Sequence, residues 1–142
     1  MKFRDYFSLR HILFAVVVVG LMMLFAIRQS NNMVKVKLEE HALHITSSQY
    51  SMTVDYVDIA SAKLETLADP GEKVENAYDD EILRAGIWKN EAWGEYHVCA
   101  DLDTESCIVL TLEDGRIFVF NRKNNKETAK IYEELLACLP NE

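Results

Sequence analysis

Hydrophobic residues are distributed very differently in the first thirty positions and in the rest of the chain. From Ile12 to Ile27 every side chain is apolar or glycine, with no charge and no proline. A bilayer core needs roughly 20 mostly apolar residues in a helix, and Arg10 and Arg28 lengthen the run by placing their charges among lipid headgroups. Because a core helix of a globular domain would carry a polar stripe, we interpret residues 11–28 as a transmembrane anchor.

A cleaved signal peptide is the alternative interpretation, because a basic segment before an apolar run describes both. Cleavage requires small residues at alternate positions, but Ala26 is preceded two positions earlier by Leu24, and Ser30 by Arg28. We therefore expect an uncleaved, single-pass anchor in the cell membrane. The short basic tail, residues 1–10, favours a cytoplasmic amino terminus and an extracytoplasmic domain, while the similar number of basic residues after the span leaves the orientation open.

After a polar linker at residues 29–33, the pattern changes to an alternation of apolar and polar positions, which is typical of strands with one buried face. Runs of this kind lie at residues 34–38, 41–45, 52–54, 57–64, 81–85, 94–100 and 107–112. Residues 69–80 contain many carboxylates and read as an acidic loop. The alternation predicts a mainly β domain at residues 34–142.

The sharpest local signal is LTLEDGRIFVFN, residues 110–121. Asp114-Gly115 between two apolar runs predicts a hairpin with a type I′ turn, which places Leu112 opposite Ile117. One face of this hairpin then carries Ile108, Leu110, Leu112, Ile117 and Val119, and the other carries Cys107, Val109, Thr111, Phe118 and Phe120. One face must line the core, and the other is either covered by another element or available to a partner.

The chain is predicted to end in a helix. Asn124 followed by Glu127 forms a capping box in which Asn replaces the usual Ser or Thr. Apolar residues then recur at helical spacing up to Leu139, and Pro140 ends the helix. The predicted fold class is therefore α+β, mainly β, with about seven antiparallel strands, a carboxyl-terminal helix and one preceding transmembrane helix.

Three stretches resemble the small bacterial PH-like domains. They are the segment from Gly86 through Trp93-Gly94-Glu95-Tyr96, the hairpin at residues 108–120, and the closing helix with Glu127-Thr128, Ile131-Tyr132 and Leu135. The resemblance implies a partly open barrel of two sheets with the helix plugging one end, and it implies no enzymatic activity. Members of that family bind varied targets.

The charge of the domain argues against several partners. Residues 31–142 hold 11 basic and 22 acidic side chains, a net charge of −11. Such a domain is repelled by nucleic acid and by anionic lipid surfaces. Lys35 and Lys37 are followed directly by Glu39 and Glu40, so the first hairpin offers no basic pocket for a phosphoinositide headgroup. We expect no nucleic acid partner.

Candidate chemistry is sparse. His97, Cys99 and Cys107 come from neighbouring predicted strands and suggest a metal or redox site, but no C-x-x-C pair supports one. Cys99 and Cys107 could also form a disulfide, although the odd total of three cysteines fits an oxidised domain poorly. The acidic run at residues 101–105 lacks the glycine and distal glutamate of an EF-hand loop. Since no catalytic grouping has motif context, we expect neither an enzyme nor a cofactor.

The predicted function is that of a non-catalytic, membrane-anchored interaction module that binds a membrane-protein partner or itself. The candidate partner-binding residues are Trp88, Trp93, Val109, Phe118 and Phe120. The two tryptophans lie in a predicted connection, where they bracket a binding surface, dip into the lipid interface beside the anchor, or fold back over an open end of the barrel. The alternative function is binding of a lipid or small hydrophobic molecule inside the partly open barrel, near the tryptophans.

Overall fold

The computed structural model describes the backbone of residues 2–31 and 33–140, and the side chains of residues 8–28 and 33–140. The chain divides into two compact units, residues 1–31 and 32–142. The first unit is a single helix and the second is the β-rich domain. Residues 29–31 of the predicted linker continue the helix, and position 32 lies outside the described residues.

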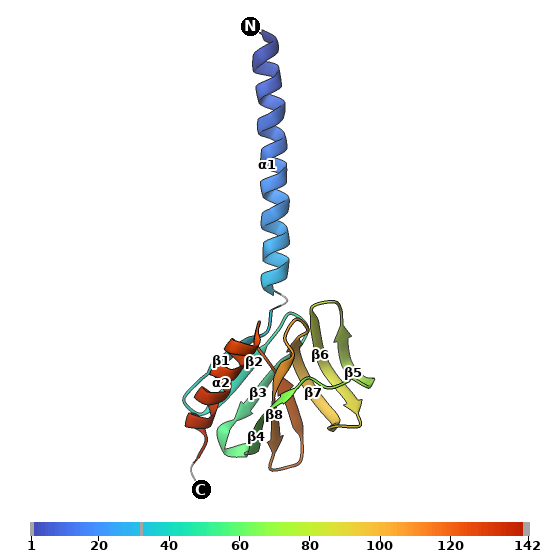
Figure 1. Cartoon of the computed structure of the whole chain (residues 1–142), viewed down its shortest axis with the longest axis vertical. Helices are drawn as coiled ribbons and strands as arrows, with labels where there is room; N and C mark the ends of the chain where they lie inside the picture. Colours follow the sequence, from blue (N-terminus) through green and yellow to red (C-terminus); the bar gives the residue numbers. More distant parts are fainter. Residues whose placement is uncertain (1, 32, 141–142) are drawn as a thin grey trace. The chain divides into compact units, whose positions relative to one another are not determined.

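The first unit is the 30-residue helix α1 (Lys2–Asn31), drawn in blue in Figure 1. Its segment Ser8–Arg28 has a mean hydropathy of 2.3, and none of it is buried in the structure. This confirms the prediction of one amino-terminal helix long and apolar enough to cross a membrane, and a signal sequence would share those properties. The helix begins earlier than the predicted anchor and ends later.

The second unit contains nine strands, a short 3-10 helix and a second α-helix within residues 33–140 (Figure 1). The elements are β1 (Lys35–Leu38), β2 (Ala42–Thr46), β3 (Ser51–Asp55), the 3-10 helix η1 (Tyr56–Asp58), β4 (Ile59–Thr66), β5 (Glu72–Asp79), β6 (Leu83–Asn90), β7 (Gly94–Asp101), β8 (Ser106–Leu112), β9 (Ile117–Phe120) and α2 (Asn125–Cys138).

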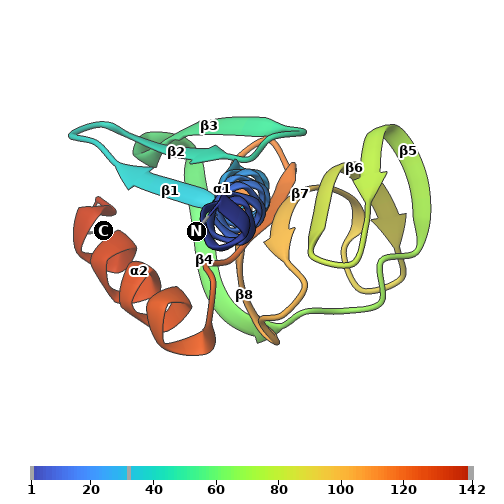
Figure 2. The same ribbon diagram turned by 90° about the horizontal axis from the view of Figure 1, so that it is seen from above.

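The strands form two sheets, of three strands in the order β1-β2-β3 and of six strands in the order β4-β8-β9-β7-β6-β5. This confirms the mainly β, partly open architecture with a carboxyl-terminal helix. Two details of the prediction were wrong, because the domain has nine strands rather than about seven and because β7 and β9 pair in parallel. In both views α2 and the β5–β6 hairpin lie at opposite ends of the domain (Figures 1 and 2).

The two faces of the six-stranded sheet bury two separate apolar clusters. The main cluster lies between the sheets and α2 and includes Leu43, Ile45, Leu83, Cys99, Ile108, Leu110, Phe118, Phe120 and Leu135. The second cluster lies on the opposite face and consists of Trp88, Tyr96, Val98, Ala100, Cys107, Val109 and Val119. Leu67, from the segment that joins β4 to β5, packs against this second cluster. The connecting segment therefore helps to cover the outer face of the sheet.

The β8–β9 hairpin is present, but its turn differs from the predicted type I′ turn. Leu112 N–H donates to the Arg116 carbonyl at 2.9 Å, so three residues form the loop and only Gly115 of the Asp-Gly pair has positive φ (91°). Such a loop shifts the pairing by one residue and turns every following side chain to the other face. Phe118 and Phe120 therefore face the main cluster, whereas the prediction placed them with Val109.

The segment between residues 69 and 90 also differs from its prediction. The expected acidic loop contains the strand β5, and the short strand expected at residues 81–85 extends to Asn90 as β6. β5 pairs with β6 through two irregularities in register, and its side chains at positions 72–76 are all exposed. Backbone pairing rather than burial defines β5, which is why alternation of apolar residues does not reveal it.

Candidate functional site

The structure places the five predicted partner-binding residues inside the domain or at its margin. Four of them are buried, namely Trp88, Val109, Phe118 and Phe120, and Trp93 is partly buried. Both faces of the β8–β9 hairpin are thus covered by other elements. Trp88 lies within β6 rather than in a connection, and its indole N–H donates to the Ala85 carbonyl at 2.9 Å. These side chains stabilise the fold and present no continuous apolar surface.

The alternative of a metal or thiol site at His97, Cys99 and Cys107 is not assembled. Cys99 belongs to the main cluster and Cys107 to the second cluster, so the six-stranded sheet separates their side chains. Both are free thiols, and burial raises the pKa of Cys99 to about 11 and that of Cys107 to about 12. Among the residues that the structure describes, no group of three His, Cys, Asp or Glu side chains is placed to hold a metal ion.

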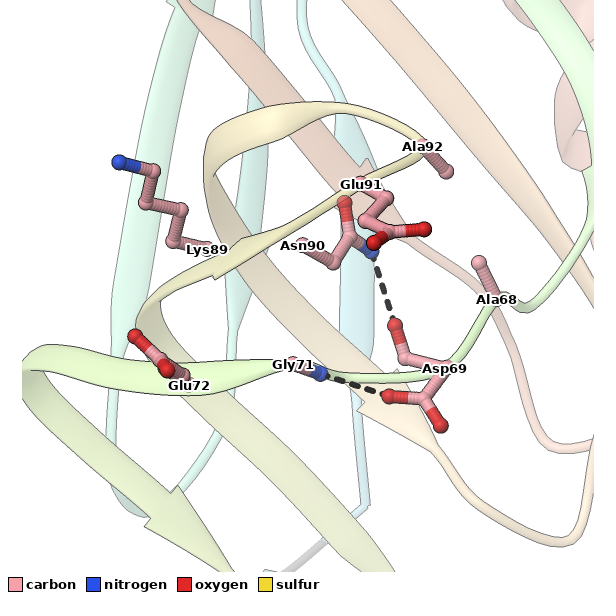
Figure 3. Close-up of a pocket in the computed structure, with 8 residues that line it drawn as sticks. All are labelled: Ala68, Asp69, Gly71, Glu72, Lys89, Asn90, Glu91 and Ala92. Carbon is pink, nitrogen blue, oxygen red and sulfur yellow. Dashed lines mark hydrogen bonds between the residues drawn. The ribbon is translucent and has the colours of Figure 1, made fainter.

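An open cleft lies instead at the end of the domain formed by the β6–β7 turn. One wall is the segment that leads into β5 and the other is the end of β6 with its turn; the lining residues are Ala68, Asp69, Gly71, Glu72, Lys89, Asn90, Glu91 and Ala92 (Figure 3). Its volume is about 720 Å³, which is within the range of ligand pockets. We call it the acidic cleft.

Asn90 holds the two walls of the acidic cleft together. Its amide nitrogen donates to the Asp69 carbonyl at 2.9 Å, and its amide oxygen accepts from the Trp93 N–H at 2.8 Å. The Asp69 carboxylate accepts from the Gly71 N–H at 2.9 Å, which fixes the turn of the opposite wall (Figure 3). These bonds use the carbonyl and one carboxylate oxygen of Asp69, so the shape of the cleft is set by the chain itself.

Gly71 is required where the walls meet. It has φ of +78°, in the left-handed region, and a Cβ atom there would collide with the Lys89 carbonyl. Only glycine combines this backbone conformation with such a close approach at low cost. The need for glycine at position 71 is explained only by the structure, because it arises from the pairing of β5 with β6.

Trp93 follows the lining residue Ala92 in the chain, and its side chain is fixed by its neighbours. Its indole N–H donates to the Glu65 carboxylate at 3.1 Å, and its ring meets the Tyr96 ring edge-on with 5.0 Å between centroids. The Tyr96 hydroxyl in turn donates to the Pro70 carbonyl at 2.8 Å. Because burial raises the pKa of Tyr96 to about 12, this hydroxyl keeps its proton at neutral pH and remains a donor.

The charge of the acidic cleft is unbalanced. Asp69, Glu72 and Glu91 line it with three carboxylates, against the single cation Lys89. Figure 3 shows the Lys89 side chain extending away from the carboxylates of Asp69 and Glu91. Chemically, such a surface attracts a cationic group and provides hydrogen-bond acceptors for it.

The acidic cleft was not predicted from the sequence. The acidic segment and the tryptophan segment were predicted to be separate connections, whereas pairing of β5 with β6 brings Glu72 opposite Lys89. The charge of residues 69–80 was visible, but its partner wall was not. None of the five predicted partner-binding residues lines the cleft, and Trp93 is the residue next to its lining residue Ala92.

Searches against protein family models, curated proteins and solved structures found no match. The resemblance to the small bacterial PH-like domains therefore stays a prediction that rests on the quoted residues alone.

Proposed function

We propose that this chain is a non-catalytic interaction module, anchored in a membrane by α1, whose acidic cleft binds a basic segment of a protein partner. The observation that carries the proposal is the cleft itself, an open site whose walls are fixed by Asn90 and Gly71 and lined by three carboxylates. A preformed concave surface lowers the ordering cost of binding. The predicted resemblance to the small bacterial PH-like domains is compatible with this role, because it implies binding without catalysis.

Charge favours a foreign partner over a second copy of the chain. The domain has 22 acidic and 11 basic side chains in residues 31–142, so two copies repel one another unless a basic patch meets the cleft. A partner that is basic near the membrane surface gains both attraction and a high local concentration from the anchor.

Site-specific photocrosslinking in cells tests the site. A photoreactive residue replaces Ala92 in the acidic cleft or, as the matched control, the exposed Ala137 on α2. We expect a discrete adduct from position 92 and none from position 137. The adduct should weaken several-fold in the variant Glu72→Gln with Glu91→Gln, and should persist in the control Glu133→Gln with Glu134→Gln, because only the first pair lines the cleft. Equal adducts at both positions, or insensitivity to the cleft charges, would refute the proposal.

We propose further that α1 stays attached and leaves the domain outside the cytoplasm, as the basic tail favours. Cys138 is exposed, whereas Cys99 and Cys107 are buried. Cys138 can therefore report on which side of the membrane the domain lies, without an added cysteine. A membrane-impermeant thiol reagent should label Cys138 in intact cells, and Cys138→Ser should remove the signal. Labelling only after lysis would place the domain in the cytoplasm, and labelled protein that lacks the helix in the soluble fraction would indicate cleavage.

A further inference from the structure

A histidine lies at the contact between the two sheets of the domain. The Nδ1 atom of His97, in β7, forms a hydrogen bond of 2.7 Å with the Tyr50 hydroxyl. Tyr50 belongs to the turn between β2 and β3. The two rings are stacked with 6.2 Å between centroids. The imidazole also stacks on Phe118 of β9, with 4.6 Å between ring centroids. The ring thus contacts both a turn of the three-stranded sheet and a neighbouring strand of the six-stranded sheet.

A second set of contacts joins the same turn to β7. The Cys99 thiol donates to the Tyr50 carbonyl at 3.4 Å and lies 3.7 Å from the Ser47 hydroxyl. Within the turn, the Ser47 N–H donates to the Tyr50 carbonyl at 2.9 Å, and the Ser47 hydroxyl accepts from the Tyr50 N–H at 3.2 Å. We call Ser47, Tyr50, His97, Cys99 and Phe118 the sheet junction.

The charged groups around the sheet junction favour a neutral imidazole. Burial and the nearby Arg116 lower the pKa of His97, against the opposing effect of Glu95 on its own strand. Arg116, in the β8–β9 turn, lies over the Phe118 ring at 5.6 Å. Burial raises the pKa of the Tyr50 hydroxyl, assisted by Cys99 and by Glu75 of β5, so the phenol stays protonated and can donate to the imidazole.

We propose that His97 is a proton-sensitive switch and that its protonation releases the Ser47–Tyr50 turn from the six-stranded sheet. At neutral pH the Tyr50 hydroxyl donates to the unprotonated Nδ1. When that nitrogen takes up a proton it becomes a donor, and the Tyr50 hydroxyl must then accept the bond and find another acceptor for its own proton. The imidazolium is also half-buried and has the like charge of Arg116 nearby, and both favour its exit to water.

The direction of the pH effect follows from linkage. The pKa of His97 lies below 6.5 while the turn is attached and returns towards 6.5 when the ring is solvated. The released conformation therefore takes up its proton first as the pH falls. Attachment is fully stable above about pH 6.5, weakens as the pH falls towards the lower pKa, and changes no further below it.

Hydrogen–deuterium exchange on the full chain in detergent micelles tests the switch at pH 7.5 and pH 5.0. Protection factors are compared after correction for the intrinsic pH dependence of amide exchange. We expect the protection of the Ser47 and Tyr50 amides to fall measurably at the lower pH, while Leu110 in the main cluster stays protected. Unchanged protection at Ser47 and Tyr50 would overturn the proposal.

Two variants assign the effect to His97. His97→Gln carries no titrating group and should abolish the pH-dependent fall, whereas His44→Gln, at a histidine bonded to Thr53 and Glu39 instead, should retain it. Arg116→Gln removes a half-exposed guanidinium that pairs with Asp114 and lies over the Phe118 ring, and it leaves the His97–Tyr50 bond in place, so it serves if the first variant does not fold. Arg116→Gln should raise the pKa of His97 and so reduce the pH-dependent loss of amide protection. The exposed control Lys123→Gln should leave that loss of protection unchanged. A fall of the natural size in His97→Gln or in Arg116→Gln would refute the switch.

Discussion

Two hairpins of the six-stranded sheet are stabilised in opposite ways. In β8–β9 both faces are covered, so Leu110 and Phe120 contact the main cluster while Val109 and Val119 contact the second. In β5–β6 the strand β5 is largely exposed at the edge of the sheet, with Val74 48% accessible. In the first hairpin both strands bury their side chains, whereas in the second β6 is buried and β5 depends mainly on backbone pairing.

The backbone of the β5–β6 hairpin comes unusually close to itself. Asn76 adopts a positive φ of 52°, which asparagine tolerates better than most residues. Its carbonyl lies so near Gly86 that a Cβ atom there would collide with it. The irregular register of β5 also makes it a poor template for another chain, because a bulged edge strand pairs badly. The two hairpins therefore show that one sheet can combine a rigid interior with a protected edge.

The largest effect is expected from truncation in the buried hairpin. Phe120→Ala removes a fully buried ring from the main cluster and should lower the free energy of unfolding by about 3–5 kcal/mol. Val74→Ala in the exposed strand should change it by about 0.5 kcal/mol or less. Urea unfolding monitored by tryptophan fluorescence measures both. Similar losses for the two variants would remove the distinction between the hairpins.

An intermediate effect is expected from adding one methyl group to β6 of the β5–β6 hairpin. Gly86→Ala forces a collision with the Asn76 carbonyl and a strained backbone at φ of +95°, at a cost of about 3 kcal/mol. The matched control is Gly115→Ala, at φ of +91° but with open space around it, which should cost about 1–2 kcal/mol. Thermal unfolding compares the two, and equal costs would mean that the close approach does not matter.

The smallest effect on the fold is expected from chemical labelling of the three thiols, which compares buried and exposed cysteines. Cys107 in β8 and Cys99 in β7 are buried with raised pKa values of about 12 and 11, whereas Cys138 is exposed. At pH 8 Cys138 should react quickly, and the other two only in denaturant, because the thiolate is the reactive form. Mass spectrometry counts the modified sites. Labelling of Cys107 in the folded protein would show that the buried hairpin opens readily.

The β8–β9 hairpin shows how far the pattern of apolar residues could predict the sheet. The β8 strand and its hairpin were found because their apolar runs are continuous, yet a loop longer by one residue reversed the faces of Phe118 and Phe120. Asp-Gly occurs both in two-residue turns and in three-residue loops with glycine in the left-handed conformation. The dipeptide therefore predicts a hairpin but does not determine its register.

The helices were easier to predict because their signals are local. The Asn124 side chain accepts from the Glu127 N–H at 2.8 Å, as the predicted cap requires, and Leu135 is fully buried on one side of α2. The acidic cleft was not predicted, since it depends on the pairing of two segments that each look like a loop. Charge was visible in one wall, but no short-range pattern indicates that Asn90 reaches the Asp69 carbonyl.

The connection from β4 to β5 has a consequence for how the domain is made. These consecutive strands lie at opposite edges of one sheet, and β4 pairs only with β8, bringing Ile59 beside Leu112. Arg122 reaches back to the Val34 carbonyl at 2.6 Å, and Tyr132 to the Ala62 carbonyl at 3.3 Å. Such distant pairings close slowly, since a long loop must be ordered first. During synthesis β4 therefore stays without its pairing partner until β8 has emerged from the ribosome, whereas β1, β2 and β3 can pair with one another earlier.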